Sequence, residues 1–125
     1  MAYTVLIVDD SPMYRSLVQV FLSGLGLNFV EASSGKAALE TLDRRPVDLI
    51  IADLSMPHMD GVEFIRILRR HPDKRLSAIP AVMLSGVTSE DRVYDALAAG
   101  ANRFLLKPVC DADLVNTLRE LLPGL

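Results

Sequence analysis

Polar residues that can do chemistry follow four of the short apolar runs in this sequence. Asp9 and Asp10 follow "TVLIV", Asp53 follows "LIIA", Ser85 closes "AVMLS", and Lys107 follows "RFLL". Carboxylates gathered in one cluster repel one another, so they either raise a pKa or bind a cation. Oxygen ligands without His or Cys favour a hard cation, and a site with few protein ligands suits Mg²⁺, which keeps several waters.

Asp53 is the predicted nucleophile of this cluster. Three carboxylates and one ammonium leave a formal charge of −2, which one divalent cation would neutralise. A carboxylate can attack phosphorus and form an acyl phosphate while a metal ion and a lysine stabilise the phosphoryl oxygens. Asp53 fits this role because it ends the central apolar run and opens a loop, although a lone Asp at a strand end is more often a turn or helix cap.

The elements that must position these residues can be read from the apolar pattern. Strand-length apolar runs occur at residues 4–8, 27–32, 47–52, 81–85 and 103–106. Five segments with helical periodicity alternate with them, marked by apolar residues such as Met13, Leu17 and Val20 in the first and Tyr94 and Leu97 in the fourth. This alternation predicts an open, doubly wound α/β domain with parallel strands and helices on both faces. In such a sheet the site lies beyond the carboxyl ends of the strands.

Composition limits the class of protein. The chain has 125 residues, and a single domain over residues 1–125 is expected. A formal charge of −3 without a basic run disfavours direct binding to nucleic acid. The single cysteine, Cys110, excludes an intrachain disulfide, and no segment resembles a signal peptide or is long enough to span a membrane. A cytoplasmic location is expected.

The chain resembles the receiver domain of two-component response regulators, and in size it is similar to single-domain chemotaxis regulators. Four motifs carry the resemblance in order: "VLIVDDSPMYR", "DLSMPHMDG", "MLSG" and "GANRFLLKP". Together they cover essentially the whole chain. The resemblance implies a flavodoxin-like sheet of five parallel strands in the order 2-1-3-4-5, flanked by five helices.

The resemblance also implies roles for the clustered residues. Asp53 matches the phosphoacceptor, which receives a phosphoryl group from the phosphohistidine of a sensor histidine kinase or a phosphotransfer protein. Asp9, Asp10, Asp53 and the backbone carbonyl of Ser55 match the Mg²⁺ ligands, and Lys107 matches a phosphoryl contact. Such a protein catalyses its own phosphorylation and slow dephosphorylation, and is not an enzyme for a separate substrate.

Further matches concern the switch that follows phosphorylation. Ser85 matches the hydroxyl that moves to contact the phosphoryl group, and Phe104 the aromatic side chain that turns into the space it leaves. Plain core packing is the alternative for Phe104. The bond between Lys107 and Pro108 is expected to be cis, which would aim the lysine at the site. The fourth predicted helix, strand 103–106 and the last helix would bind a downstream protein or a fused output domain.

Four positions bear on the lifetime of the signal and on association. Ser55 and Val87 occupy the two lifetime-tuning positions, and neither can readily orient an attacking water, so slow self-dephosphorylation is expected. Asn102 and Arg103 stand where receivers of transcription factors carry acidic residues, so a monomer or weak dimer is expected.

Other classes remain open alternatives. A haloacid-dehalogenase-type, Mg²⁺-dependent phosphatase also uses a strand-terminal Asp, but it carries a second Asp two residues later, where this chain has Ser55. A receiver that is not phosphorylated and serves only for docking is disfavoured, because all the functional positions are filled. A flavin- or nucleotide-binding flavodoxin-like module is disfavoured because the first turn, "DDSPMY", lacks glycine and carries two negative charges.

Overall fold

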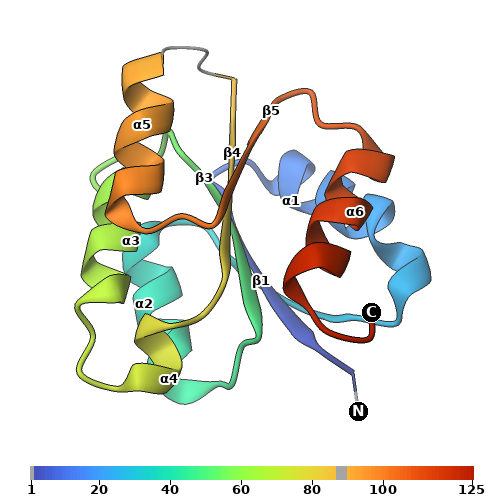
Figure 1. Ribbon diagram of the computed structural model, residues 1–125, viewed down its shortest axis with the longest axis horizontal. Helices are drawn as coiled ribbons and strands as arrows, with labels where there is room; N and C mark the ends of the chain where they lie inside the picture. The colour runs from blue at the N-terminus through green and yellow to red at the C-terminus, as the bar shows by residue number, and fades with distance from the viewer. Residues whose placement is uncertain (1, 87–89) are drawn as a thin grey trace.

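The computed structural model describes residues 2–86 and 90–125, in which strands and helices alternate along the chain (Figure 1). The strands are β1 (Thr4–Val8), β2 (Asn28–Ala32), β3 (Leu49–Asp53), β4 (Ala81–Ser85) and β5 (Arg103–Leu106). The α-helices are α1 (Pro12–Phe21), α2 (Gly35–Arg44), α3 (Gly61–Arg69), α4 (Lys74–Ser77), α5 (Glu90–Ala99) and α6 (Asp111–Leu121), and a 3₁₀ turn, η1, spans Ser23–Leu25. The strand bounds lie within about two residues of the predicted ones. None of the described helices has the length and apolar character needed to cross a membrane.

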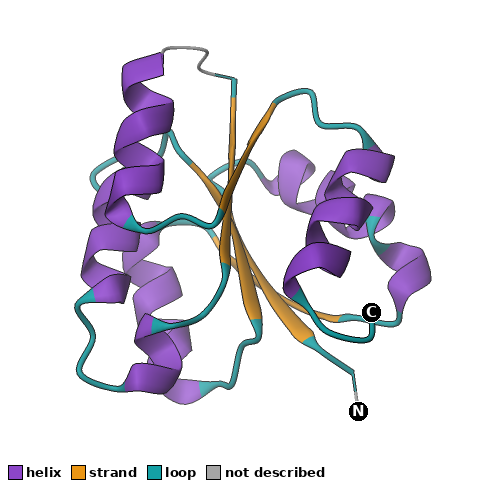
Figure 2. Ribbon diagram, viewed as in Figure 1, coloured by secondary structure: helices purple, strands orange, loops and turns teal. Residues whose placement is uncertain are grey.

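The five strands form one parallel sheet in the order β2-β1-β3-β4-β5 (Figure 2, orange). Ile7 of β1 lies beside Ile51 of β3, and Ala52 of β3 lies beside Met83 of β4. This arrangement confirms the predicted doubly wound, flavodoxin-like order 2-1-3-4-5. Because every pairing is parallel, the carboxyl ends of the strands share one edge of the sheet.

Helices cover both faces of the sheet, as predicted. Figure 1 shows α2, α3, α4 and α5 on one face and α1 with α6 on the other. Each face has its own buried apolar cluster, so the central strands are apolar on both sides. All five residues of β3 are buried, including Asp53 at its end.

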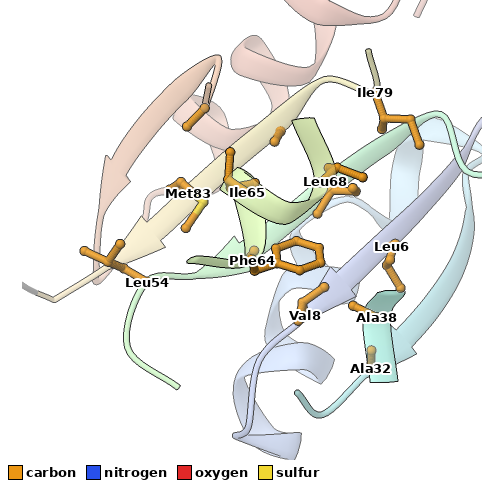
Figure 3. Packing of buried hydrophobic residues seen from close by; sticks show 14 of the residues in the cluster. Leu6, Val8, Ala32, Ala38, Leu54, Phe64, Ile65, Leu68, Ile79 and Met83 are labelled. Carbon is orange, nitrogen blue, oxygen red and sulfur yellow. The ribbon is translucent and has the colours of Figure 1, made fainter. Parts of the chain in front are cut away.

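Phe64 of α3 anchors the larger of the two clusters (Figure 3). Its side chain is fully buried, and the ring lies close to Leu6 and Val8 of β1. Leu68, one turn further along α3, continues the same buried face. This packing holds α3 against the sheet and so fixes the start of the helix beside the carboxyl edge.

The described residues form six α-helices, one more than the five predicted. The additional helix, α4, is a single turn, and Asp73 caps it by accepting a 2.9 Å hydrogen bond from the N–H of Arg75. Four residues carry too little periodicity to indicate a helix in a sequence. The fourth and fifth predicted helices therefore correspond to α5 and α6, and the predicted readout surface corresponds to α5, β5 and α6.

The apolar residues that indicated helices α1 and α5 are not all buried in the structure. On α1, Met13 and Val20 are 78% and 65% exposed, whereas Val18 is fully buried. On α5, Tyr94 is 71% exposed, whereas Ala96 is buried in the cluster shared with α3. Each helix carries apolar residues on two neighbouring stripes, and the period of 3.6 residues does not say which stripe faces the sheet.

Candidate functional site

The carboxyl edge of the sheet brings the predicted site residues together. Asp9 and Asp10 follow β1, Asp53 ends β3, Ser85 ends β4, and Lys107 follows β5. One carboxylate oxygen from each of the three aspartates lies within 4.8 Å of the others. Residues as much as 98 positions apart thus meet, because the parallel strands end at the same edge.

The three carboxylates differ in their exposure to solvent. Asp9 and Asp53 are 3% and 8% exposed, whereas Asp10 is an exposed residue. Oδ1 of Asp9 accepts a 2.9 Å hydrogen bond from the N–H of Ser11, and Oδ1 of Asp53 accepts a 3.3 Å bond from the N–H of Ser55. These backbone contacts orient both buried carboxylates.

Lys107 brings a positive charge to the other oxygen of each buried carboxylate. Its Nζ atom lies 3.0 Å from Oδ2 of Asp9 and 3.5 Å from Oδ2 of Asp53. Its backbone N–H donates a 2.8 Å hydrogen bond to the carbonyl of Ser85, which ties the loop after β5 to the end of β4. The peptide bond from Lys107 to Pro108 is cis, the arrangement that the resemblance implies.

Burial raises the pKa of Asp53 above its ordinary value. The ammonium of Lys107 opposes this shift in pKa, and the carboxylate of Asp9 adds to it. The loss of water around Asp53 therefore outweighs the attraction of the lysine. The negative charge of the cluster is incompletely compensated, and a bound cation would relieve it.

The donor set fits Mg²⁺. All three side chains of the cluster offer oxygen, which Mg²⁺ prefers, and the exposed Asp10 leaves one side open for the waters that the ion keeps. Asp9, Asp10 and Asp53 are the side chains that would hold it. The carbonyl of Ser55 stays a predicted ligand, since the contact described for this residue is the one from its N–H to Asp53.

Ser85 and Phe104 lie on neighbouring strands near the cluster. Ser85 is 1% exposed at the end of β4, and the register of β4 and β5 places it beside Leu106. Phe104 lies beside Met83 and is partly buried against the cluster that underlies α3 and α5. Val87 lies outside the described residues, so its role in the lifetime of the phosphoryl group stays a prediction.

Two residues of α1 that the sequence did not single out also border the site. Nη1 of Arg15 donates a 2.5 Å hydrogen bond to the carbonyl of Asp9, and its Nε donates a 2.9 Å bond to Oε1 of Glu31 on β2. The ring of Tyr14 faces the ammonium of Lys107, with 3.9 Å between Nζ and the ring centroid. Their place in the first turn of α1 is the signal that could have found them, because helical side chains lean towards the N-terminus, which here adjoins the site.

The fold and the cluster define a doubly wound α/β domain with an acidic, metal-compatible site at its carboxyl edge, suited to a phosphate-bearing partner. Residues 5–119 match the family described as "Response regulator receiver domain". The chain belongs to this family and is a receiver domain of two-component response regulators.

Curated relatives differ in how much of their length the chain spans. It is 40% identical over 116 residues to the KDP operon transcriptional regulatory protein KdpE of Escherichia coli, covering 92% of this chain and 49% of KdpE. It is 36% identical over 117 residues to the Regulator of RpoS of Escherichia coli, covering 94% of this chain and 33% of that protein. An uncharacterised 14.6 kDa protein of Leptolyngbya boryana is 34% identical over 116 residues, covering 93% of this chain and 87% of that protein. The chain thus spans about half and about a third of the first two relatives.

Solved structures confirm the fold. The Vibrio cholerae chemotaxis protein CheY4 superimposes with a TM-score of 0.89 at 33% identity, covering 98% of this chain and 100% of CheY4. The signal receiver domain of a signal transduction histidine kinase from Syntrophus aciditrophicus gives a TM-score of 0.89 at 34% identity, covering 99% of this chain and 92% of that one.

Proposed function

We propose that this receiver domain is a phosphorylation-dependent switch in which Asp53 takes a phosphoryl group from the phosphohistidine of a sensor histidine kinase or a phosphotransfer protein. The observation that supports this role is the placement of Asp53, a buried carboxylate on the central strand with Asp9, Asp10 and Lys107 around it. An oxygen of Asp53 bonds to phosphorus as the P–N bond of the phosphohistidine breaks, and the electron pair of that bond stays on the imidazole nitrogen.

The neighbours of Asp53 stabilise the transferred group. Mg²⁺, held by Asp9, Asp10, Asp53 and the Ser55 carbonyl, supplies positive charge beside the phosphoryl oxygens when it is bound. The ammonium of Lys107 is already 3.5 Å from Oδ2 of Asp53, so it can contact a phosphoryl oxygen added there. Ser55 provides no carboxylate for an attacking water, which favours a lasting acyl phosphate over turnover, and Val87 is expected to act in the same direction.

Ser85 and Phe104 convert the phosphoryl group into a change of surface. The hydroxyl of Ser85 contacts the new phosphoryl oxygens, and Phe104 moves into the space that this shift leaves beside β4. The surface that responds is α5, β5 and α6, where Tyr94, Leu97 and Leu106 are exposed apolar side chains. A downstream protein or a fused output domain binds there.

Contacts within the chain support a monomer or a weak dimer. Oδ1 of Asn102 accepts hydrogen bonds from Nη2 of Arg69 (3.1 Å) and from the N–H of Ala81 (2.8 Å). Arg103 lies 3.5 Å from the carboxylate of Glu120. Asn102 and Arg103, which stand where receivers of transcription factors carry acidic residues, are therefore both engaged within their own chain.

Intact-mass measurement after incubation with Mg²⁺ and acetyl phosphate tests the proposal. The wild-type protein is expected to gain the mass of one phosphoryl group, and a chelator should prevent the gain. Asp53→Asn should show no adduct, while Asp43→Asn, a change at an exposed aspartate on α2, should behave as the wild type. Absence of an adduct on the wild type would contradict the phosphoacceptor role and favour a docking receiver, and sustained hydrolysis of phosphate esters would favour a phosphatase.

A further inference from the structure

Lys107 is held between the acidic cluster on one side and an aromatic ring on the other. Its Nζ atom lies 3.0 Å from Oδ2 of Asp9, 3.5 Å from Oδ2 of Asp53, and 3.9 Å from the centroid of the Tyr14 ring. An ammonium within about 6 Å of a ring centroid is attracted by the negative face of the ring. The carboxylates and Tyr14 thus act on the same charge.

Tyr14 is itself anchored at both ends. Its backbone N–H donates a 3.2 Å hydrogen bond to Oγ of Ser11, the N-cap of α1. Its hydroxyl oxygen accepts a 3.5 Å bond from the N–H of Val109, two residues after Lys107. The ring packs against the apolar cluster on the α1 and α6 side of the sheet. Tyr14 therefore connects α1, the helix that follows Asp9 and Asp10, to the loop that carries Lys107.

A lysine needs such support more than the other groups of the site do. Its charge is carried on a flexible four-carbon stem, and each rotatable bond gives the ammonium an alternative position in solvent. Asp9 and Asp53 hold the ammonium only while their charges are not neutralised, and Mg²⁺ would compete for the same carboxylates. The attraction of the Tyr14 ring does not depend on the charge of the carboxylates.

We propose that Tyr14 is a positioning residue that keeps the Lys107 ammonium over the acidic cluster when the metal ion and the phosphoryl group arrive. The inference rests on the proposed function, since it assigns Tyr14 a part in phosphoryl transfer to Asp53. Tyr14 acts through Lys107 and needs no contact with the phosphoryl group. The face of the ring carries the effect, so a phenyl ring suffices and an aliphatic side chain does not.

Rates of phosphorylation by acetyl phosphate in the presence of Mg²⁺ test this role. Tyr14→Leu is expected to lower the rate by about three- to tenfold, a loss that lies within the range for one cation–π contact. Tyr14→Met, which fills the space without a ring, should show the same loss, and Tyr14→Phe should restore a rate close to that of the wild type. Phe21→Leu is the matched control, because Phe21 is an aromatic residue on the same helix that packs against the same cluster. Its rate should stay close to that of the wild type.

The proton chemical shifts of the Lys107 ε-methylene group provide a readout that needs no phosphorylation. Protons over the face of a ring are shifted upfield, so the Tyr14→Leu and Tyr14→Met proteins should show a downfield change at Lys107. The Tyr14→Phe and Phe21→Leu proteins should not. If the wild type is not phosphorylated but these shifts follow the expected pattern, the proposed function fails while the contact between Tyr14 and Lys107 stands.

Two results would overturn the inference. Unchanged rates and unchanged Lys107 shifts in both non-aromatic variants would show that the ring does not hold the lysine. A Tyr14→Phe protein as slow as Tyr14→Leu would assign the effect to the hydroxyl contact with Val109. Thermal unfolding of each variant identifies a protein that has failed to fold, and the second non-aromatic variant then decides the outcome.

Discussion

The Nζ atom of Lys107 lies 3.0 Å from Oδ2 of Asp9, so the acidic cluster contains an ion pair of its own. The side chain of Asp9 is 4% exposed and that of Lys107 is 20% exposed, which leaves little water to screen the pair. The lysine therefore pairs with a carboxylate that a metal ion in the cluster would also use. A Mg²⁺ ion bound to the cluster would therefore compete with the lysine for Asp9 before a phosphoryl group arrives.

Removal of the Lys107 ammonium should tighten Mg²⁺ binding. Lys107→Met is expected to increase the affinity for Mg²⁺ by about tenfold, or about 1.4 kcal/mol, because it removes a positive charge from the same carboxylates. The chain contains no tryptophan, so isothermal titration calorimetry is the suitable measurement. Lys36→Met, at an exposed position on α2, should leave the affinity unchanged. Weaker binding by Lys107→Met would show that the lysine supports the metal site and does not compete with the ion.

The raised pKa of Asp53 predicts how stability without metal depends on pH. A carboxyl group whose pKa is higher in the folded state stabilises the protein below its ordinary pKa, and this contribution is lost as pH rises through the folded-state pKa. In a chelating buffer, Asp53→Asn should therefore be more stable than the wild type at neutral pH, by on the order of 1 kcal/mol. The difference should shrink towards zero as pH falls below the ordinary pKa of aspartate.

Urea unfolding of both proteins across this range of pH measures the difference in the free energy of unfolding. Added Mg²⁺ should stabilise the wild type more than Asp53→Asn, since the variant has lost one charged ligand. A wild type that is more stable than Asp53→Asn at neutral pH without metal would mean that the pairing with Lys107 outweighs the cost of burial.

The strand ends of this protein could be predicted because their positions follow from local patterns. Five apolar runs alternate with helical segments, and parallel topology then forces Asp9, Asp53 and Lys107 to one edge whatever the details of packing. The nature of the cluster follows from residue type alone. The three carboxylates repel one another, attract the lysine ammonium and favour a bound cation. The particular sheet order came from the resemblance to a family, because alternation of elements alone allows several orders.

The parts that the sequence did not reveal depend on the direction in which side chains point. Tyr14 and Arg15 contact the site because the face of α1 that carries them is turned towards it. Met13 and Val20, two of the apolar residues that indicated this helix, lie on an exposed face instead. The single-turn helix α4 depends on a side-chain cap at Asp73 that leaves no periodic signal. Local propensity gives the elements, but rotation about a helix axis is decided by packing.

Arg69 forms a half-buried junction at the opposite end of β4 and β5 from the site. Its guanidinium donates to the carbonyls of Gly100 (3.0 Å), Ser77 (3.0 Å) and Ile79 (2.7 Å) and to Oδ1 of Asn102 (3.1 Å). Burial lowers the pKa of Arg69 below its ordinary value. Ser77 ends α4, Ile79 lies in the loop before β4, and Gly100 and Asn102 lie in the loop between α5 and β5.

Loss of this junction should destabilise the protein. Arg69→Met is expected to lower the free energy of unfolding by about 2–4 kcal/mol, because it leaves several acceptors without their donor. Arg69→Lys should recover only part of the loss, since an ammonium cannot reproduce the planar set of donors. Arg70→Ala, at the exposed neighbouring position, should change stability by less than about 0.5 kcal/mol. Equal effects of Arg69→Met and Arg70→Ala in urea unfolding would contradict this role.

Gly61 should be required for the geometry of Asp53, because the start of α3 lies directly against the end of β3. The N–H of Gly61 donates a 2.7 Å hydrogen bond to the carbonyl of Leu54, and a Cβ atom at Gly61 would lie 2.7 Å from the carbonyl oxygen of Asp53 and 2.9 Å from Cα of Leu54. The tip of Met83, which such a Cβ would also meet, can move aside, but the backbone of Asp53 and Leu54 cannot move without shifting the predicted phosphoacceptor.

Gly61→Ala is therefore expected to cost about 1–3 kcal/mol of unfolding free energy and to slow phosphorylation by acetyl phosphate. Gly24→Ala is the matched control, because a Cβ atom there would have no neighbour within 4 Å. That change should leave both the phosphorylation rate and the stability close to those of the wild type. A Gly61→Ala protein that keeps the wild-type rate and stability would show that α3 can shift away from β3 without disturbing Asp53, and that this close contact does not position the phosphoacceptor.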